Sequence, residues 1–98
     1  MAYQKPDDVR SPKSKWTLIR VLDDKGEDNT SLALGRWEDH NVLAIRWNGS
    51  DDQPLGSPQS RGLPTWFIIP DHLVGPILTT LPTDMQTLVR SLIDIPEA

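Results

Sequence analysis

The sequence contains no cysteine, which excludes disulfide bonds, a catalytic thiolate and the cysteine-ligated zinc sites of many small domains. It also has no apolar run near the ~20 residues that a membrane-spanning helix needs. Residues 1–15 lack the apolar core of a signal peptide. We therefore expect a cytoplasmic protein that does not enter a membrane.

Hydrophobic residues are also few, at 37% of the 98 residues, whereas nine residues are proline. A chain of this length forms one domain, and this composition leaves it a small core with long loops. Four tryptophans compensate in part, because each indole buries a large apolar area. Self-association would bury more surface, so we expect a homodimer.

Basic residues are outnumbered, since ten Lys and Arg oppose fourteen Asp and Glu and the net charge is −4. The net charge is +2 over residues 1–16, −2 over 17–50 and −4 over 51–98. An acidic chain gains little from general attraction to phosphate. Nucleic-acid binding would therefore need a locally basic face.

Four segments have the apolar, partly alternating character of strands, namely 16–22, 31–37, 42–47 and 65–69. Short turns join the first three, which predicts an antiparallel meander. The nearly continuous apolar run of the fourth predicts a strand buried on both faces. The polar residues before them, 1–14, show no periodic apolar pattern, so we expect a flexible tail before one domain at 15–98.

After Pro70, apolar residues recur at helical spacing in two stretches, 73–81 and 85–92. Thr83 and Gln86 predict a capping box at the start of the second helix. The expected fold is therefore α+β, with a four-stranded, mainly antiparallel sheet followed by two C-terminal helices packed on one face.

Residues 48–64 form the most informative segment, 17 residues of mainly Gly, Pro, Ser, Asp and Gln between two Trp-bearing strands. Loops longer than about 12–15 residues are uncommon in compact domains and are usually functional or disordered. Its single cation, Arg61, suits a carboxylate, a phosphate or a planar base, because guanidinium offers a rigid fork of donors. The alternative is a stiff crossover in which Arg61 pairs with Asp51 or Asp52.

We place the candidate ligand-binding site at this loop and at the strand ends that flank it. Its residues are Gln59, Ser60 and Arg61 from the loop, and Arg46, Trp47 and Trp66 from the strands. Glycines in the loop would allow close approach of a ligand to the backbone. Strand alternation places Arg46 and Trp47 on opposite faces, which favours a core or interface role for the tryptophans over a base-stacking platform.

No catalytic or metal site is predicted. His40 lies in a turn and His72 at a helix start, where both are expected to be solvated, and no nucleophile, base and orienting group come together in the sequence. The acidic pairs at 7–8, 23–24 and 51–52 lack the spacing of a calcium loop. We expect neither an enzyme nor a cofactor.

Two resemblances extend this interpretation. The segment Arg46-Trp47-Asn48-Gly49, followed by PQSRG-x-PTWF at 58–67, resembles short bacterial proteins of accessory and mobile genes, including integron gene cassettes. That resemblance implies a class of gene and no activity. The element order, with Ile45-Arg46-Trp47 before a Gly-containing loop, is similar to bacterial relatives of the positive transcriptional coactivator.

The second resemblance implies a dimer that binds single-stranded DNA through the sheet. Its contacts here would be Arg20, Arg36, Arg46 and Trp37. The chain departs from that family in its longer loop, its acidic charge and its extra C-terminal helix. The leading interpretation is therefore a non-enzymatic binding module that uses loop 48–64 to contact a protein or a small anionic partner. The alternative is a single-stranded nucleic-acid-binding dimer.

Overall fold

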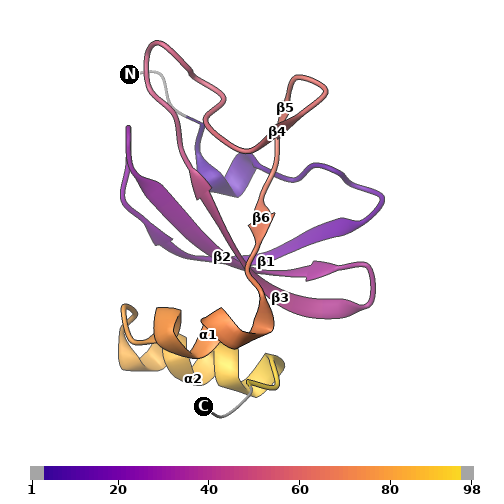
Figure 1. Ribbon diagram of the computed structural model, residues 1–98, viewed down its shortest axis with the longest axis vertical. Coiled ribbons are helices and arrows are strands. Elements are labelled where there is room, and N and C mark those ends of the chain that lie inside the picture. The colour runs from indigo at the N-terminus through magenta and orange to yellow at the C-terminus, as the bar shows by residue number, and fades with distance from the viewer. Residues whose placement is uncertain (1–3, 96–98) are drawn as a thin grey trace.

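The computed structural model describes residues 4–95 and contains a four-stranded antiparallel sheet of order β1-β2-β3-β6. The strands are β1 (Trp16–Asp24), β2 (Thr30–Trp37), β3 (His40–Trp47) and β6 (Phe67–Ile68). A short hairpin, β4 (Gln59–Ser60) and β5 (Leu63–Pro64), precedes β6. Helices α1 (Asp71–Leu78) and α2 (Thr83–Leu92) follow, so the predicted α+β fold is confirmed (Figure 1).

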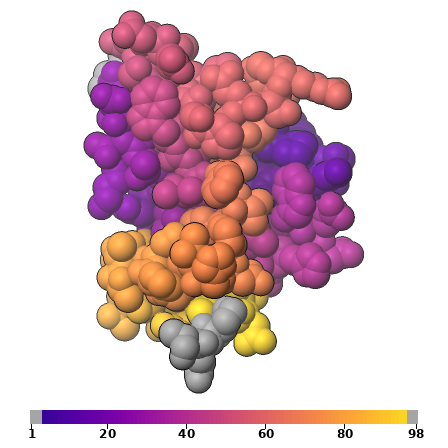
Figure 2. Space-filling view, in the orientation of Figure 1, coloured from indigo at the N-terminus to yellow at the C-terminus, as the bar shows by residue number. Residues whose placement is uncertain are grey.

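The two helices cover one face of the sheet. Antiparallel register places Leu34 of β2 opposite Leu43 of β3, and both side chains are fully buried. They belong to one core cluster with helix residues Val74, Leu78 and Val89. Figures 1 and 2 show the helices, orange to yellow, gathered at one end of the molecule, with the long loop at the other. The helices therefore leave part of this sheet face uncovered.

The opposite face of the sheet packs against the segment that precedes it. This second cluster contains Val9, Trp16 and Trp66, together with Ala33 and Ala44. Residues 6–8 form a 3-10 helix, η1 (Pro6–Asp8), and Val9 is fully buried. Residues 4–14 thus differ from the expected flexible tail, because Val9 supplies core surface on a face that the helices do not reach. Residues 1–3 lie outside the described part of the chain.

Two local expectations are wrong. Strand β6 is an edge strand of two residues, and Phe67 is 58% exposed, because the helices do not cover the sheet at this point. The capping box does not form, since Pro82 precedes α2 and the Gln86 side chain donates to the Leu81 carbonyl at 2.9 Å. Neither described helix is long and apolar enough to cross a membrane.

Candidate functional site

The long loop begins at a buried side chain, Asn48, which is fixed by three hydrogen bonds. Its Nδ2 donates to the carbonyl of Gly26 at 2.9 Å and to Asp24 Oδ1 at 3.2 Å. Its Oδ1 accepts a bond of 2.7 Å from the buried hydroxyl of Ser31. Asn48 therefore joins the start of the loop to the β1–β2 turn, a role that its position after a strand did not reveal.

Backbone pairing closes the loop twice. Trp47 and Ser57 exchange two hydrogen bonds of 2.8 and 2.9 Å, which close the segment between them. Thr65 then donates to the carbonyl of Pro58 at 3.0 Å, which closes the β4–β5 hairpin. The predicted irregular loop is therefore two connected, hydrogen-bonded units.

Two glycines allow the first unit to fold tightly. Gly56 has φ +66°, and a Cβ atom there would lie 2.1 Å from the Trp47 carbonyl oxygen. Gly49 has φ +104°, and a Cβ there would lie 2.5 Å from the Gln53 carbonyl. Backbone carbonyls of Trp47 and Gln53 occupy the space beside these two glycines, which the sequence was expected to leave for a ligand.

Arg46 lies beneath the loop and holds it to the sheet. Its guanidinium is buried, at 2% residue exposure, and donates to the carbonyls of Thr65, at 2.5 Å, and Leu55. Within residues 4–95 it forms no ion pair, and its Nε has no hydrogen-bond partner. Burial lowers the pKa of Arg46 to about 10, so the group is still a cation at neutral pH. Arg46 thus connects both loop units through their backbone carbonyls.

The β4–β5 hairpin presents Arg61 at its tip. Ser60 pairs with Leu63, so Arg61 and Gly62 form a two-residue turn, and their φ values of +53° and +78° are those of a type I′ turn. Arg61 is exposed and makes no hydrogen bond or ion pair with other described residues, so the structure does not contain the alternative pairing with Asp51 or Asp52. Figure 2 shows the hairpin extending from the upper part of the molecule.

The two other predicted loop residues lie on the same hairpin. Ser60 is exposed beside the tip. Gln59 is exposed too, and its Nε2 donates to the Gly56 carbonyl at 2.9 Å, which joins the hairpin to the first loop unit. The structure therefore brings Gln59, Ser60 and Arg61 together on one projecting element.

The predicted tryptophans lie in different environments. Trp66 is buried, and its Nε1 donates to the Val9 carbonyl at 2.8 Å, so it belongs to the core. Trp47 is half-buried and borders a shallow hollow of about 330 Å³ on the uncovered sheet face. The hollow is lined by Thr30, Ile45, Arg46, Trp47, Ser57, Pro58 and Phe67. We call Ile45, Trp47, Pro58 and Phe67 the aromatic patch.

Sequence reasoning did not include Phe67 among the site residues. The run TWFII at 65–69 predicted burial, and only the short length of β6 and its edge position leave Phe67 exposed. A signal was present nonetheless, because alternation places Phe67 and Trp66 on opposite faces and only one of them could enter the Trp16 cluster.

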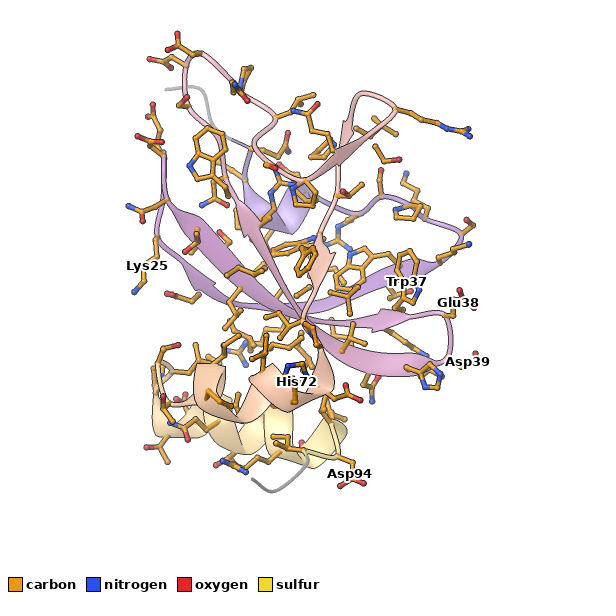
Figure 3. All side chains as sticks on the ribbon, viewed as in Figure 1. Lys25, Trp37, Glu38, Asp39, His72 and Asp94 are labelled. Carbon is orange, nitrogen blue, oxygen red and sulfur yellow. The ribbon has the colours of Figure 1, made fainter. Side chains whose placement is uncertain are left out.

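Neither histidine lies in the long loop, and both side chains are exposed. His72 is exposed at the start of α1, and Figure 3 shows it to the left of the turn that carries Glu38 and Asp39. His40 is exposed beside that turn. No group of three or more His, Asp or Glu among residues 4–95 is arranged to hold a metal ion.

Comparisons with models of protein families, with curated proteins and with solved structures found no match to this chain. The function is therefore proposed from the geometry of the hairpin, the loop beneath it and the aromatic patch.

Proposed function

We propose that the protein is a non-enzymatic binding module whose β4–β5 hairpin contacts an anionic group of a protein partner through Arg61. The observation that carries the proposal is the backbone at the tip, where Arg61 has φ +53°. Asn, Asp or Gly normally occupy this position of a type I′ turn, because the positive φ brings the Cβ atom of most other residues too close to the backbone. An exposed arginine at such a position supports a role for the guanidinium outside the fold.

The base of the hairpin supports the same proposal. The bonds from Arg46 to Leu55 and Thr65, and the pairing of Trp47 with Ser57, fix the loop before any partner arrives. A preordered binding element loses less conformational entropy on association than a flexible loop does. The anchored hairpin is therefore suited to presenting one cation to a carboxylate on a partner.

The test is selection of short random peptides displayed on phage, with the immobilised full chain as target. We expect enriched peptides to carry Asp or Glu. Arg61→Ala should weaken their binding about tenfold or more, because charge-assisted hydrogen bonds are lost. Arg90→Ala is the matched control, since Arg90 is also exposed but lies in the last turn of α2. Enriched peptides without acidic residues, or equal binding by parent and Arg61→Ala, would contradict the proposal.

A second candidate is single-stranded nucleic-acid binding, which the aromatic patch favours because bases stack on exposed aromatic rings. The contacts would then be Trp47 and Phe67, since Arg46 is buried and Trp37 packs against the Trp16 cluster. Figure 3 shows Trp37 beside the β2–β3 turn, away from the loop. Fluorescence anisotropy with labelled single-stranded oligonucleotides at low and physiological salt tests this candidate. Binding that weakens with salt and is lost in Phe67→Ser supports it.

A further inference from the structure

We infer that the aromatic patch is the contact surface of a homodimer, in which two copies of this chain meet across a two-fold axis. The inference concerns a different surface from the hairpin tip and does not rest on the Arg61 contact. It starts from the position of the patch on the face that α1 and α2 cover only in part (Figure 1).

The patch has a shape that can complement itself. Phe67 on β6 has 58% of its surface exposed. It also borders the 330 Å³ hollow, whose other walls include Trp47 and Pro58. In a dimer with a two-fold axis, both copies use the same surface and each contact occurs twice. An exposed ring beside a hollow on one copy can therefore face the hollow of the other copy, and the reverse. Each Phe67 can then enter the hollow of the partner.

The charge of the patch favours a second copy as its occupant. Near a two-fold axis each side chain faces its own counterpart, so charged groups would repel there. The residues that line the hollow are uncharged except Arg46, which is 2% exposed and whose side chain lies on the opposite sheet face. An uncharged patch on a chain of net charge −4 is therefore compatible with self-contact.

The available area predicts a weak dimer. A standard interface buries about 800 Å² on each partner, and this chain exposes 6133 Å² in total. The four patch residues are too few to supply that area, so adjoining surface must contribute. A second hollow of about 270 Å³ continues from Thr30 and Ile45 to Ile77 on α1. Its lining also includes Asp23 and Lys25, which form a salt bridge of 3.4 Å with each other and so bring no net charge to the adjoining surface. We expect an interface at the small end of the range, with a dissociation constant on the order of micromolar.

The experiment is sedimentation velocity of the full chain over a concentration series that begins in the low micromolar range. We expect a monomer–dimer equilibrium, and Phe67→Ser should raise its dissociation constant at least tenfold. Ile19→Ser and Leu92→Ser are matched controls, because they remove exposed apolar side chains on β1 and α2. Circular dichroism and thermal unfolding check that each variant is folded.

A cross-linking measurement identifies the surface independently, since the chain has no cysteine. Phe67→Cys and Ser57→Cys variants, mixed well above the dissociation constant and oxidised, should form a disulfide-linked heterodimer, because Ser57 borders the hollow that residue 67 faces and the Ser57→Cys copy keeps its own Phe67 contact. Ile19→Cys should not cross-link to either. A monomer at every concentration, or a dimer that Phe67→Ser leaves unchanged, would overturn the inference. Loss of oligonucleotide binding in Phe67→Ser of a monomeric protein would overturn it too, because the patch would then serve another partner.

The two proposals fail separately. Arg61→Ala should leave the dimer intact, and Phe67→Ser should leave binding of acidic peptides intact. A parent chain that selects acidic peptides but stays monomeric would count against the patch alone, and a parent chain that dimerises but selects no acidic peptides would count against the hairpin alone.

Discussion

The indole of Trp16 lies against Gly35 on the neighbouring strand, so closely that a Cβ atom on Gly35 would be 2.1 Å from Trp16 Cη2. Trp16 also packs on Trp66, with ring centroids 6.1 Å apart and planes inclined by 33°. The absence of a side chain at Gly35 thus makes room for the Trp16 indole in the core. This contact connects β1, β2 and the chain before β6.

Gly35→Ala should lower the free energy of unfolding by about 3 kcal/mol, because the new methyl group overlaps the Trp16 ring and core overpacking is costly. Urea denaturation followed by far-UV circular dichroism measures the change. Gly75→Ala is the control, since its Cβ would meet only Ile95 at 3.6 Å, and it should stay within about 1 kcal/mol of the parent. Equal stability of parent and Gly35→Ala would show that Trp16 can move without cost.

Arg46→Ala should lower the free energy of unfolding by about 3 kcal/mol, because it leaves the carbonyls of Leu55 and Thr65 without their donor and opens a cavity under the loop. Hydrogen exchange at the backbone amides of Trp47 and Ser57 should accelerate. Arg36→Ala, at an exposed arginine of the same sheet, should change stability by about 0.5 kcal/mol or less. Unchanged exchange in Arg46→Ala would mean that backbone pairing alone holds the loop.

Trp66→Phe should release the N-terminal segment, since Val9 loses the indole donor that binds its carbonyl. The expected cost is about 1–2 kcal/mol. Trypsin should then cleave after Arg10, Lys13 and Lys15 faster than in the parent. Trp37→Phe removes a half-buried indole of the same cluster and should leave cleavage there unchanged. Identical digestion of parent and Trp66→Phe would count against this anchoring role.

Arg61→Asn should stabilise the fold by up to about 1 kcal/mol, because Asn tolerates the positive φ of a type I′ turn better than Arg does. The melting temperature should rise by a few degrees. The same variant should lose affinity for acidic peptides. A gain in stability together with a loss of peptide binding would show that Arg61 contributes to binding and destabilises the turn. A loss of stability would show that Arg61 supports the hairpin.

Much of the fold followed from local patterns. The β-branched and alternating segments predicted strands within two residues of β1, β2 and β3, and helical spacing of apolar residues predicted α1 and α2. These predictions succeed because the buried side chains of a strand and of a helix recur at different spacings along the sequence. The last strand was harder, since a run of apolar residues does not show that the helices end before they cover Phe67.

The site could be predicted only in part. A long loop with one cation directed attention to Arg61, which the structure places at an exposed tip. Arg46 and Trp66 were included because they lie on the strands that flank the loop, yet both are buried, one under the loop and one in the core. Single-residue chemistry does not reveal burial, because burial depends on which distant segment covers the side chain.

Local sequence patterns are enough to establish the α+β class, the order of the elements and the position of the long loop, because propensity, periodicity and turn residues act over short distances along the chain. Which side chains are available for contact depends instead on how the whole chain packs. Arg46 and Thr65, or Val9 and Trp66, meet through packing of segments far apart in sequence. The exposure of Phe67 depends in the same way on where α1 and α2 lie on the sheet, which the local pattern around it does not encode.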